Sequence, residues 1–118
     1  MTATARYLVD DLEEAVGFYT GRLGFEERRS FGPVTLVQRG DLELWLSGPG
    51  SSGREQEGAE PGGWSRIVIE VDDLDAFVAR LTNVGVRFRN EVVSGPGGKQ
   101  IILDDPDGNA IELFEARE

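Results

Sequence analysis

The segment VDDLEEAV at residues 9–16 returns as VDDLDAFV at residues 71–78, and this repeat decides the fold. In both copies an apolar residue precedes two aspartates and an amphipathic stretch, which ends near Gly24 in the first copy and near Gly85 in the second. The second aspartate of each pair is suited to cap a helix, because its side-chain oxygen can accept a hydrogen bond from a free backbone N–H. A glycine just beyond the last turn is typical of a left-handed helix end. The repeat therefore predicts two copies of one strand–helix unit.

Three short strands are predicted after each helix, from apolar runs separated by turn residues. They cover residues 25–29, 34–38 and 41–47 in the first copy and residues 88–93, 99–104 and 109–114 in the second. Residues 48–63 are rich in Gly, Ser, Glu and Pro, which predicts a linker or a mobile flap. We therefore expect a single α+β domain over residues 1–118, with one module at 1–47, the linker at 48–63 and a second module at 64–118.

The composition excludes several classes of function. The 118 residues include 12 basic and 22 acidic side chains, so the formal net charge is -10 and a nucleic acid would be repelled. There is no cysteine to form a disulfide, and no histidine to serve as a metal ligand or a general base. No apolar run approaches the roughly 20 residues of a membrane helix, and the first residues do not resemble a signal peptide. We therefore expect a cytoplasmic protein without a nucleic-acid or membrane partner.

Alternating side chains divide each predicted sheet into an apolar face and a mixed face. In the last strand of the first copy, leucines at positions 42, 44 and 46 alternate with Glu43, Trp45 and Ser47. The last strand of the second copy repeats the pattern, with Glu112 and Phe114 on its mixed face. The apolar faces are expected to pack under the helices. Aromatic rings at Trp45 and Phe114 indicate that the mixed faces line a sheltered cavity.

Three motifs in fixed order carry a family resemblance. They are VDDL at residues 9–12 with LGF at 23–25, EVDDL at 70–74, and DPDGNAIEL at 105–113. With these motifs the chain resembles the vicinal oxygen chelate superfamily, which includes glyoxalase I, extradiol dioxygenases, fosfomycin-resistance enzymes and bleomycin-binding proteins. The resemblance covers nearly the whole chain. It implies two tandem β-α-β-β-β modules that form an eight-stranded open cup, usually completed in a homodimer.

The resemblance also locates the positions where metal-dependent members of that superfamily carry their ligands. These positions fall on Thr4, Glu43, Arg66 and Glu112 in this sequence. Two carboxylates and a hydroxyl make a weak site for Zn²⁺, Fe²⁺ or Ni²⁺, which favour imidazole. Arg66 adds a positive charge there, and its guanidinium could bridge Glu43 and Glu112. We therefore expect no metal, no cofactor and no catalytic residue. A purely structural ion-pair cluster is an equally weighted interpretation.

Several aromatic residues are candidates for ligand contact. Trp45 and Phe114 are interpreted as stacking surfaces for a planar ligand. Trp64, beside the linker, could act as a lid or only as an apolar plug, and Phe31 is weighed in the same way. The full set of predicted ligand-binding residues is Arg6, Phe31, Glu43, Trp45, Ser47, Trp64, Arg66, Val68, Glu112 and Phe114.

These observations favour a metal-independent binding protein of the bleomycin-resistance type. It would confer resistance by sequestering an aromatic or cationic natural product in the cleft of a homodimer. The first alternative is a metal-independent lyase or isomerase that acts on a small or polyketide-like substrate, with Glu43 or Glu112 as base. The second is a protein-interaction module that binds no small ligand.

Overall fold

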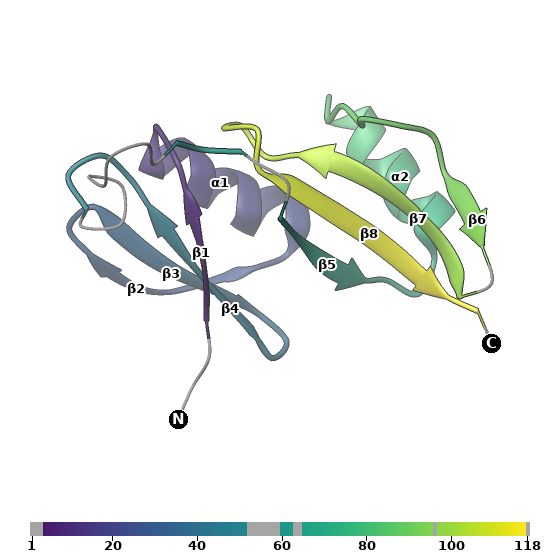
Figure 1. Ribbon diagram of the computed structural model, residues 1–118, viewed down its shortest axis with the longest axis horizontal. Helices are drawn as coiled ribbons and strands as arrows, with labels where there is room; N and C mark the ends of the chain where they lie inside the picture. The colour runs from purple at the N-terminus through teal and green to yellow at the C-terminus, as the bar shows by residue number, and fades with distance from the viewer. Residues whose placement is uncertain (1–3, 52–59, 63–64, 96, 118) are drawn as a thin grey trace. The chain divides into compact units, whose positions relative to one another are not determined.

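The computed structural model describes residues 4–51, 60–62, 65–95 and 97–117, and it divides into two compact units (Figure 1). The first unit comprises Met1–Gly62 together with Asp105–Asn109, and the second comprises Gly63–Asp104 together with Ala110–Glu118. Trp64, one of the predicted ligand-binding residues, lies outside the described residues.

The first unit contains one helix and a four-stranded sheet. Its elements are β1 (Ala5–Leu8), α1 (Leu12–Leu23), β2 (Glu26–Phe31), β3 (Val34–Arg39) and β4 (Leu42–Ser47). The strand order is β1-β4-β3-β2, with β1 parallel to β4 and the other pairs antiparallel. Helix α1 contacts β2, β3 and β4, and its buried side chains are Ala15, Tyr19 and Leu23. They pack with Val37, Leu44 and Leu46, which are fully buried in the sheet.

The second unit repeats this order. Its elements are β5 (Arg66–Glu70), α2 (Leu74–Asn83), β6 (Val93–Gly95), β7 (Gly98–Asp104) and β8 (Ala110–Ala116). The strand order β5-β8-β7-β6, with β5 parallel to β8, is the same as in the first unit. The structure thus confirms the predicted fold class, two tandem β-α-β-β-β modules. Among the described residues, no helix has the length and apolar character that a membrane crossing requires.

The helix boundaries follow the predicted capping chemistry. Asp11 caps α1 by accepting a hydrogen bond from the Glu14 N–H at 3.0 Å, and Asp73 caps α2 by accepting one from the Ala76 N–H at 3.1 Å. The helices end before Gly24 and Gly85, whose φ angles of 77° and 86° lie in the left-handed region. The aspartate pairs of the repeat therefore need no metal to explain them.

The strand predicted over residues 88–93 was largely wrong. Phe88 forms only an isolated bridge with Leu103, and the strand itself covers Val93–Gly95. Between them the Asn90 side-chain oxygen accepts a hydrogen bond from the Ile102 N–H at 2.9 Å. The Asn90 side chain thus takes the place of a backbone hydrogen-bond partner for Ile102. Regular backbone pairing with β7 begins only at Val93, after Asn90.

The turn Asp105–Asn109 joins β7 to β8 but belongs to the first unit. The buried Asp105 carboxylate accepts hydrogen bonds from the Asp107 and Asn109 N–H groups at Oδ1, at 2.9 and 2.8 Å. Its Oδ2 accepts from the Tyr19 hydroxyl and from Asn109 Nδ2, both at 2.9 Å. Asn109 Nδ2 also donates to the Leu8 carbonyl at 2.8 Å. One carboxylate therefore organises the turn and ties it to α1.

Burial, together with the charge of Asp105 and the hydrogen bond to it, raises the pKa of the Tyr19 phenol above its usual value near 10. Because the folded-state pKa is the higher one, the associated stability is fully present below pH ~10 and is lost as the pH rises further. We expect the wild-type protein to lose roughly 1 kcal/mol more than Tyr19→Phe between pH 9 and pH 11. Urea unfolding at several pH values measures this difference. Parallel pH profiles for the two proteins would contradict the assignment.

Gly98 provides a test of the β7–β8 hairpin. Its φ is 149°, and an added Cβ would lie 2.1 Å from the Glu115 carbonyl oxygen. The neighbouring Gly97 has only Phe114 Cζ near the same added atom, at 3.9 Å. Gly98→Ala should lower the free energy of unfolding by about 2 kcal/mol or more, because backbone must shift. The matched control Gly97→Ala should change it by less than about 0.5 kcal/mol. Chemical denaturation of both variants gives the comparison, and equal losses would be inconsistent with the clash.

Candidate functional site

The strand register places four side chains in one row on the face of the first sheet opposite α1. Arg6 of β1 pairs with Trp45 of β4, Trp45 pairs with Leu36 of β3, and Leu36 pairs with Arg29 of β2. Paired residues project from the same face of a sheet. We call Arg6, Trp45, Leu36 and Arg29 the first-sheet row. The parallel row next to it contains Leu8, Ser47, Val34 and Phe31.

Both aromatic rings on this face are covered by a guanidinium. The Arg6 guanidinium carbon lies 5.1 Å from the centroid of the Trp45 ring, and that of Arg29 lies 4.7 Å from the Phe31 ring. Trp45 is half-buried, whereas Phe31 is 50% exposed and both arginines are exposed. Leu36 and Val34, which lie between them, are half-buried. The face therefore offers an apolar floor with a cation stacked on an aromatic ring at either side.

Arg29 reaches this face because the turn between β2 and β3 is short. Phe31 pairs with Val34 next to the turn, so Arg29 and Phe31 both join the first-sheet face. Ser30 turns to the helix side, where its hydroxyl lies 3.0 Å from that of the buried Thr35. The pairing shifts only between Glu27 and Arg29, where Arg28 is an extra residue, and such a bulge changes which face the residues before it project from.

Two buried polar atoms on β4 have no hydrogen-bond partner among the described residues, namely Trp45 Nε1 and Ser47 Oγ. Ser47 is fully buried. Glu43, a further predicted site residue on the same strand, is half-buried and lies opposite Gln38 in the register. The predicted residues Arg6, Phe31, Glu43, Trp45 and Ser47 thus share one face of the first unit.

The second unit brings together the remaining described candidates. Arg66 Nε donates a hydrogen bond to Glu112 Oε1 at 2.8 Å, and the two side chains are 39% and 8% exposed. Val68 lies opposite Glu112 in the register and is 53% exposed, and the half-buried Phe114 follows two residues later on β8. Of the predicted bridge from Arg66 to Glu43 and Glu112, the contact with Glu112 is therefore present.

The sequence model of the Glyoxalase/Bleomycin resistance protein/Dioxygenase superfamily matches residues 3–113. The chain belongs to this superfamily. A solved superfamily member from Sphaerobacter thermophilus is 28% identical, with a TM-score of 0.83, and the match covers 98% of this chain and 96% of that one.

Two structures with functional names show the same fold at lower identity. Lactoylglutathione lyase from Agrobacterium tumefaciens is 22% identical with a TM-score of 0.78, covering 97% of this chain and 92% of that one. A fosfomycin resistance protein from Mesorhizobium loti is 18% identical with a TM-score of 0.72, covering 99% and 92%. A protein named as a lyase and a protein named for resistance thus share this fold, so the fold does not decide between such roles.

The residues of the second unit do not fit the metal that the superfamily fold can hold. Arg66 occupies one expected ligand position, and a guanidinium has donors but no lone pair for a metal. Glu112 occupies another, and its Oε1 is already engaged by Arg66. Among the described residues, no cluster of three or more Asp, Glu, His or Cys side chains has a metal-binding arrangement. We therefore derive no step through a metal.

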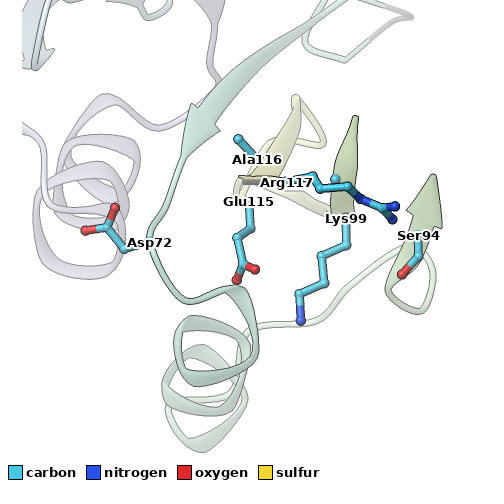
Figure 2. Close-up of a pocket in the computed structure, with 7 residues that line it drawn as sticks. Asp72, Ser94, Lys99, Glu115, Ala116 and Arg117 are labelled. Atoms are coloured by element: carbon cyan, nitrogen blue, oxygen red, sulfur yellow. The ribbon is translucent and has the colours of Figure 1, made fainter. Parts of the chain in front are cut away.

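A separate hollow of about 510 Å³ opens in the second unit (Figure 2). Figure 2 shows the Lys99 and Glu115 side chains extending to the same side, with Asp72 apart from them. Both groups have structural partners: Lys99 Nζ lies 3.0 Å from Asp75 Oδ2, and Glu115 Oε1 accepts from the Leu74 N–H at 2.8 Å. The hydrogen bond with Asp75 raises the pKa of Lys99. These groups hold the start of α2, and we do not assign them to a ligand.

Sequence reasoning missed Arg29 and Leu36. Alternation counted back from Phe31 places Arg29 on the same face of the strand, so the sequence did contain a signal for Arg29. The alignment of both residues with Arg6 and Trp45 was not available, because it depends on the order and register of the four strands. In the sequence, Leu36 resembles any leucine of the hydrophobic core. Only its position in the first-sheet row identifies it as part of the candidate site.

The Arg66–Glu112 pair can be tested by a double-mutant cycle. Arg66→Met leaves a largely buried carboxylate without its partner, whereas Arg66→Met combined with Glu112→Gln removes the charge as well. Because Arg66 is 39% exposed, we discount the energy of a buried pair and expect a coupling free energy of about 1 kcal/mol. Urea unfolding of the four proteins measures it.

The exposed pair Arg28–Glu26 is the matched control, since its side chains are 52% and 75% exposed. Its cycle should give a coupling close to zero. Additive effects at Arg66 and Glu112 would show that their contact does not contribute to stability.

Proposed function

We propose that this protein is a metal-independent small-molecule binding protein that sequesters an aromatic or cationic natural product and so protects against it. The observation that carries the proposal is the Arg6–Trp45 stack on an open sheet face, beside a second stack of Arg29 on Phe31. The first-sheet row and its apolar neighbours form the central part of the proposed ligand surface.

Magnitudes support stacking as the main source of affinity. A cation over an exposed aromatic ring contributes about 0.5–1 kcal/mol. A planar ligand that buries ~200 Å² of apolar surface would gain about 5 kcal/mol at the usual ~25 cal/mol per Å². The free energy gained by burying the ligand ring therefore exceeds the free energy lost when the ring displaces a guanidinium from an aromatic side chain. The half-buried Leu36 and Val34 supply the rest of the apolar contact.

The Arg66–Glu112 pair supports the absence of metal chemistry in this proposal. Superfamily members that use a metal employ it to polarise substrate oxygens, and a guanidinium paired with a carboxylate cannot replace it as a Lewis acid. The fosfomycin resistance protein named above gives the superfamily a precedent for resistance. We also propose that two copies associate to complete the ligand surface, and light scattering during size exclusion would measure this directly.

A thermal-shift screen with antibiotics, planar natural products and divalent metals tests the proposal. A ligand present at 100 times its Kd stabilises the folded protein by about 2.7 kcal/mol, which corresponds to a rise in Tm of several degrees. Planar natural products are expected to give such a rise. Strong stabilisation by Zn²⁺, Ni²⁺ or Mn²⁺, with none by natural products, would refute the proposal.

Trp45→Leu should weaken binding of any compound found in this way by about tenfold or more, because it removes the stacking ring but keeps an apolar side chain. Phe77→Leu is the matched control, since Phe77 is also half-buried and carries the Arg80 guanidinium at 4.4 Å, but on helix α2 of the second unit. Isothermal titration calorimetry gives the affinities. Equal affinities for Trp45→Leu and wild type would remove Trp45 from the ligand surface.

Mass spectrometry of the recovered ligand separates sequestration from the enzymatic alternative. Sequestration returns the ligand unchanged in amounts equal to the protein. A lyase or isomerase would convert an excess of ligand over protein, and that result would favour the alternative.

A further inference from the structure

We infer that the preferred ligand is a planar aromatic carboxylate, held by the guanidiniums of Arg6 and Arg29 over the floor formed by Leu36 and Val34. This inference rests on the proposed function, and it chooses between ligand charges that the proposed function leaves open. It also runs against the overall charge of the protein, which is -10.

The contacts of the two arginines point to an anion. Within the part of the chain that the structure describes, neither Arg6 nor Arg29 forms a salt bridge, and each contacts an aromatic ring. By contrast, Arg28, Arg66 and Arg89 each pair with a carboxylate. A guanidinium that lies over a ring keeps its N–H donors at its edge, where they can bind a carboxylate in a bidentate manner. Arg6 and Arg29 therefore retain the donors that an anionic ligand needs.

The strand register sets the size and shape of the ligand. Arg6 and Arg29 lie on the two outer strands of the row, three strand spacings apart, which is about 14 Å between backbones. The side chains of Trp45 and Leu36 occupy the two strands between them. A bicyclic or tricyclic aromatic ring fits this interval, with its flat surface on Leu36 and Val34 and its acidic group toward one guanidinium. A second acceptor at the far end of the ring would reach the other guanidinium.

Local charge outweighs net charge at such a surface. Charges more than ~8 Å away are largely screened at physiological ionic strength, so the side chains of this face set the potential over the apolar floor. The nearest acidic side chains on this face, Glu43 and Glu26, lie in the adjoining row with Gln38, on the side away from Val34 and Phe31, and Glu26 pairs with Arg28. A cationic ligand stacked on Trp45 would have to displace Arg6 or lie beside its like charge. At ~5 Å, in water, this repulsion alone weakens binding about fourfold.

The short turn between β2 and β3 gives the inference a separate structural basis. Phe31 pairs with Val34 next to this turn, and counting back from it places Arg29 opposite Leu36, before the bulge at Arg28 is reached. Arg28 pairs with Glu26 at 3.2 Å. The hairpin thus places on this face an aromatic ring and an arginine that forms no salt bridge among the described residues, which is the combination that an aromatic anion requires.

Three probes with one ring system test the inference: 2-naphthoate, 2-naphthamide and 2-(aminomethyl)naphthalene. Their affinities for the full chain are measured by calorimetry at neutral pH. We expect 2-naphthoate to bind at least about tenfold more tightly than the ammonium probe, with the amide between them. Arg6→Gln or Arg29→Gln should weaken 2-naphthoate about tenfold and leave the amide nearly unchanged.

Two control variants replace arginines that lie off the proposed surface. Arg28→Gln removes the neighbouring arginine of the same strand, and Arg80→Gln removes an arginine stacked on an aromatic ring of the second unit. Both should bind 2-naphthoate like the wild-type protein. Circular dichroism and the Tm show whether each variant is folded.

Three results would overturn the inference. They are equal or tighter binding of the ammonium probe, equal weakening of 2-naphthoate binding in the control variants, and no binding of any probe at millimolar concentration. The proposed function is tested separately by the thermal-shift screen. A natural product that binds in that screen while 2-naphthoate shows no preference over the ammonium probe would leave the proposed function standing and remove only the ligand class.

Discussion

The carboxylate of Asp105 is the polar interaction on which much of this fold depends. It is buried, and it accepts hydrogen bonds from two backbone N–H groups, the Tyr19 hydroxyl and the Asn109 side chain. A buried carboxylate is tolerated only when its oxygens are satisfied by donors, and here each oxygen accepts two. The turn that it organises joins two strands of the second unit and yet belongs to the first. The second copy of the repeat thus contributes a turn to the first unit.

Most of the fold could be predicted from the sequence because its signals are local. The repeated VDDL segment, the capping aspartates and the glycines after each helix all act within one turn of the residues that they constrain. The prediction for residues 88–93 was wrong because Asn90 satisfies the Ile102 N–H with its side chain, a contact between segments 12 residues apart. The role of Tyr19 was missed for the same reason, because its partner Asp105 lies 86 residues away in the sequence.

The candidate site could be predicted in part. Alternation placed Glu43, Trp45 and Ser47 on one face and Glu112 with Phe114 on another. Arg66 was predicted to bridge Glu43 and Glu112, and its hydrogen bond to Glu112 is present. The charge of the proposed ligand surface could not be predicted from the sequence. A net charge of -10 favoured a cationic ligand, whereas the side chains on the first sheet place two guanidiniums over its aromatic rings. Composition averages over the whole surface, and binding depends on the charges within about one Debye length.

The position of β2 separates the residues of the proposed ligand surface from the residues that stabilise the core. Every residue of β2 is exposed, and the strand lies at the edge of its sheet, so its register is not fixed by the buried core. Loss of one residue between Arg29 and the turn would present a different pair of side chains beside Leu36 and Val34, while β3, β4 and α1 keep their packing. A change in chain length at this strand can therefore alter the charge of the proposed ligand surface with no substitution in the core.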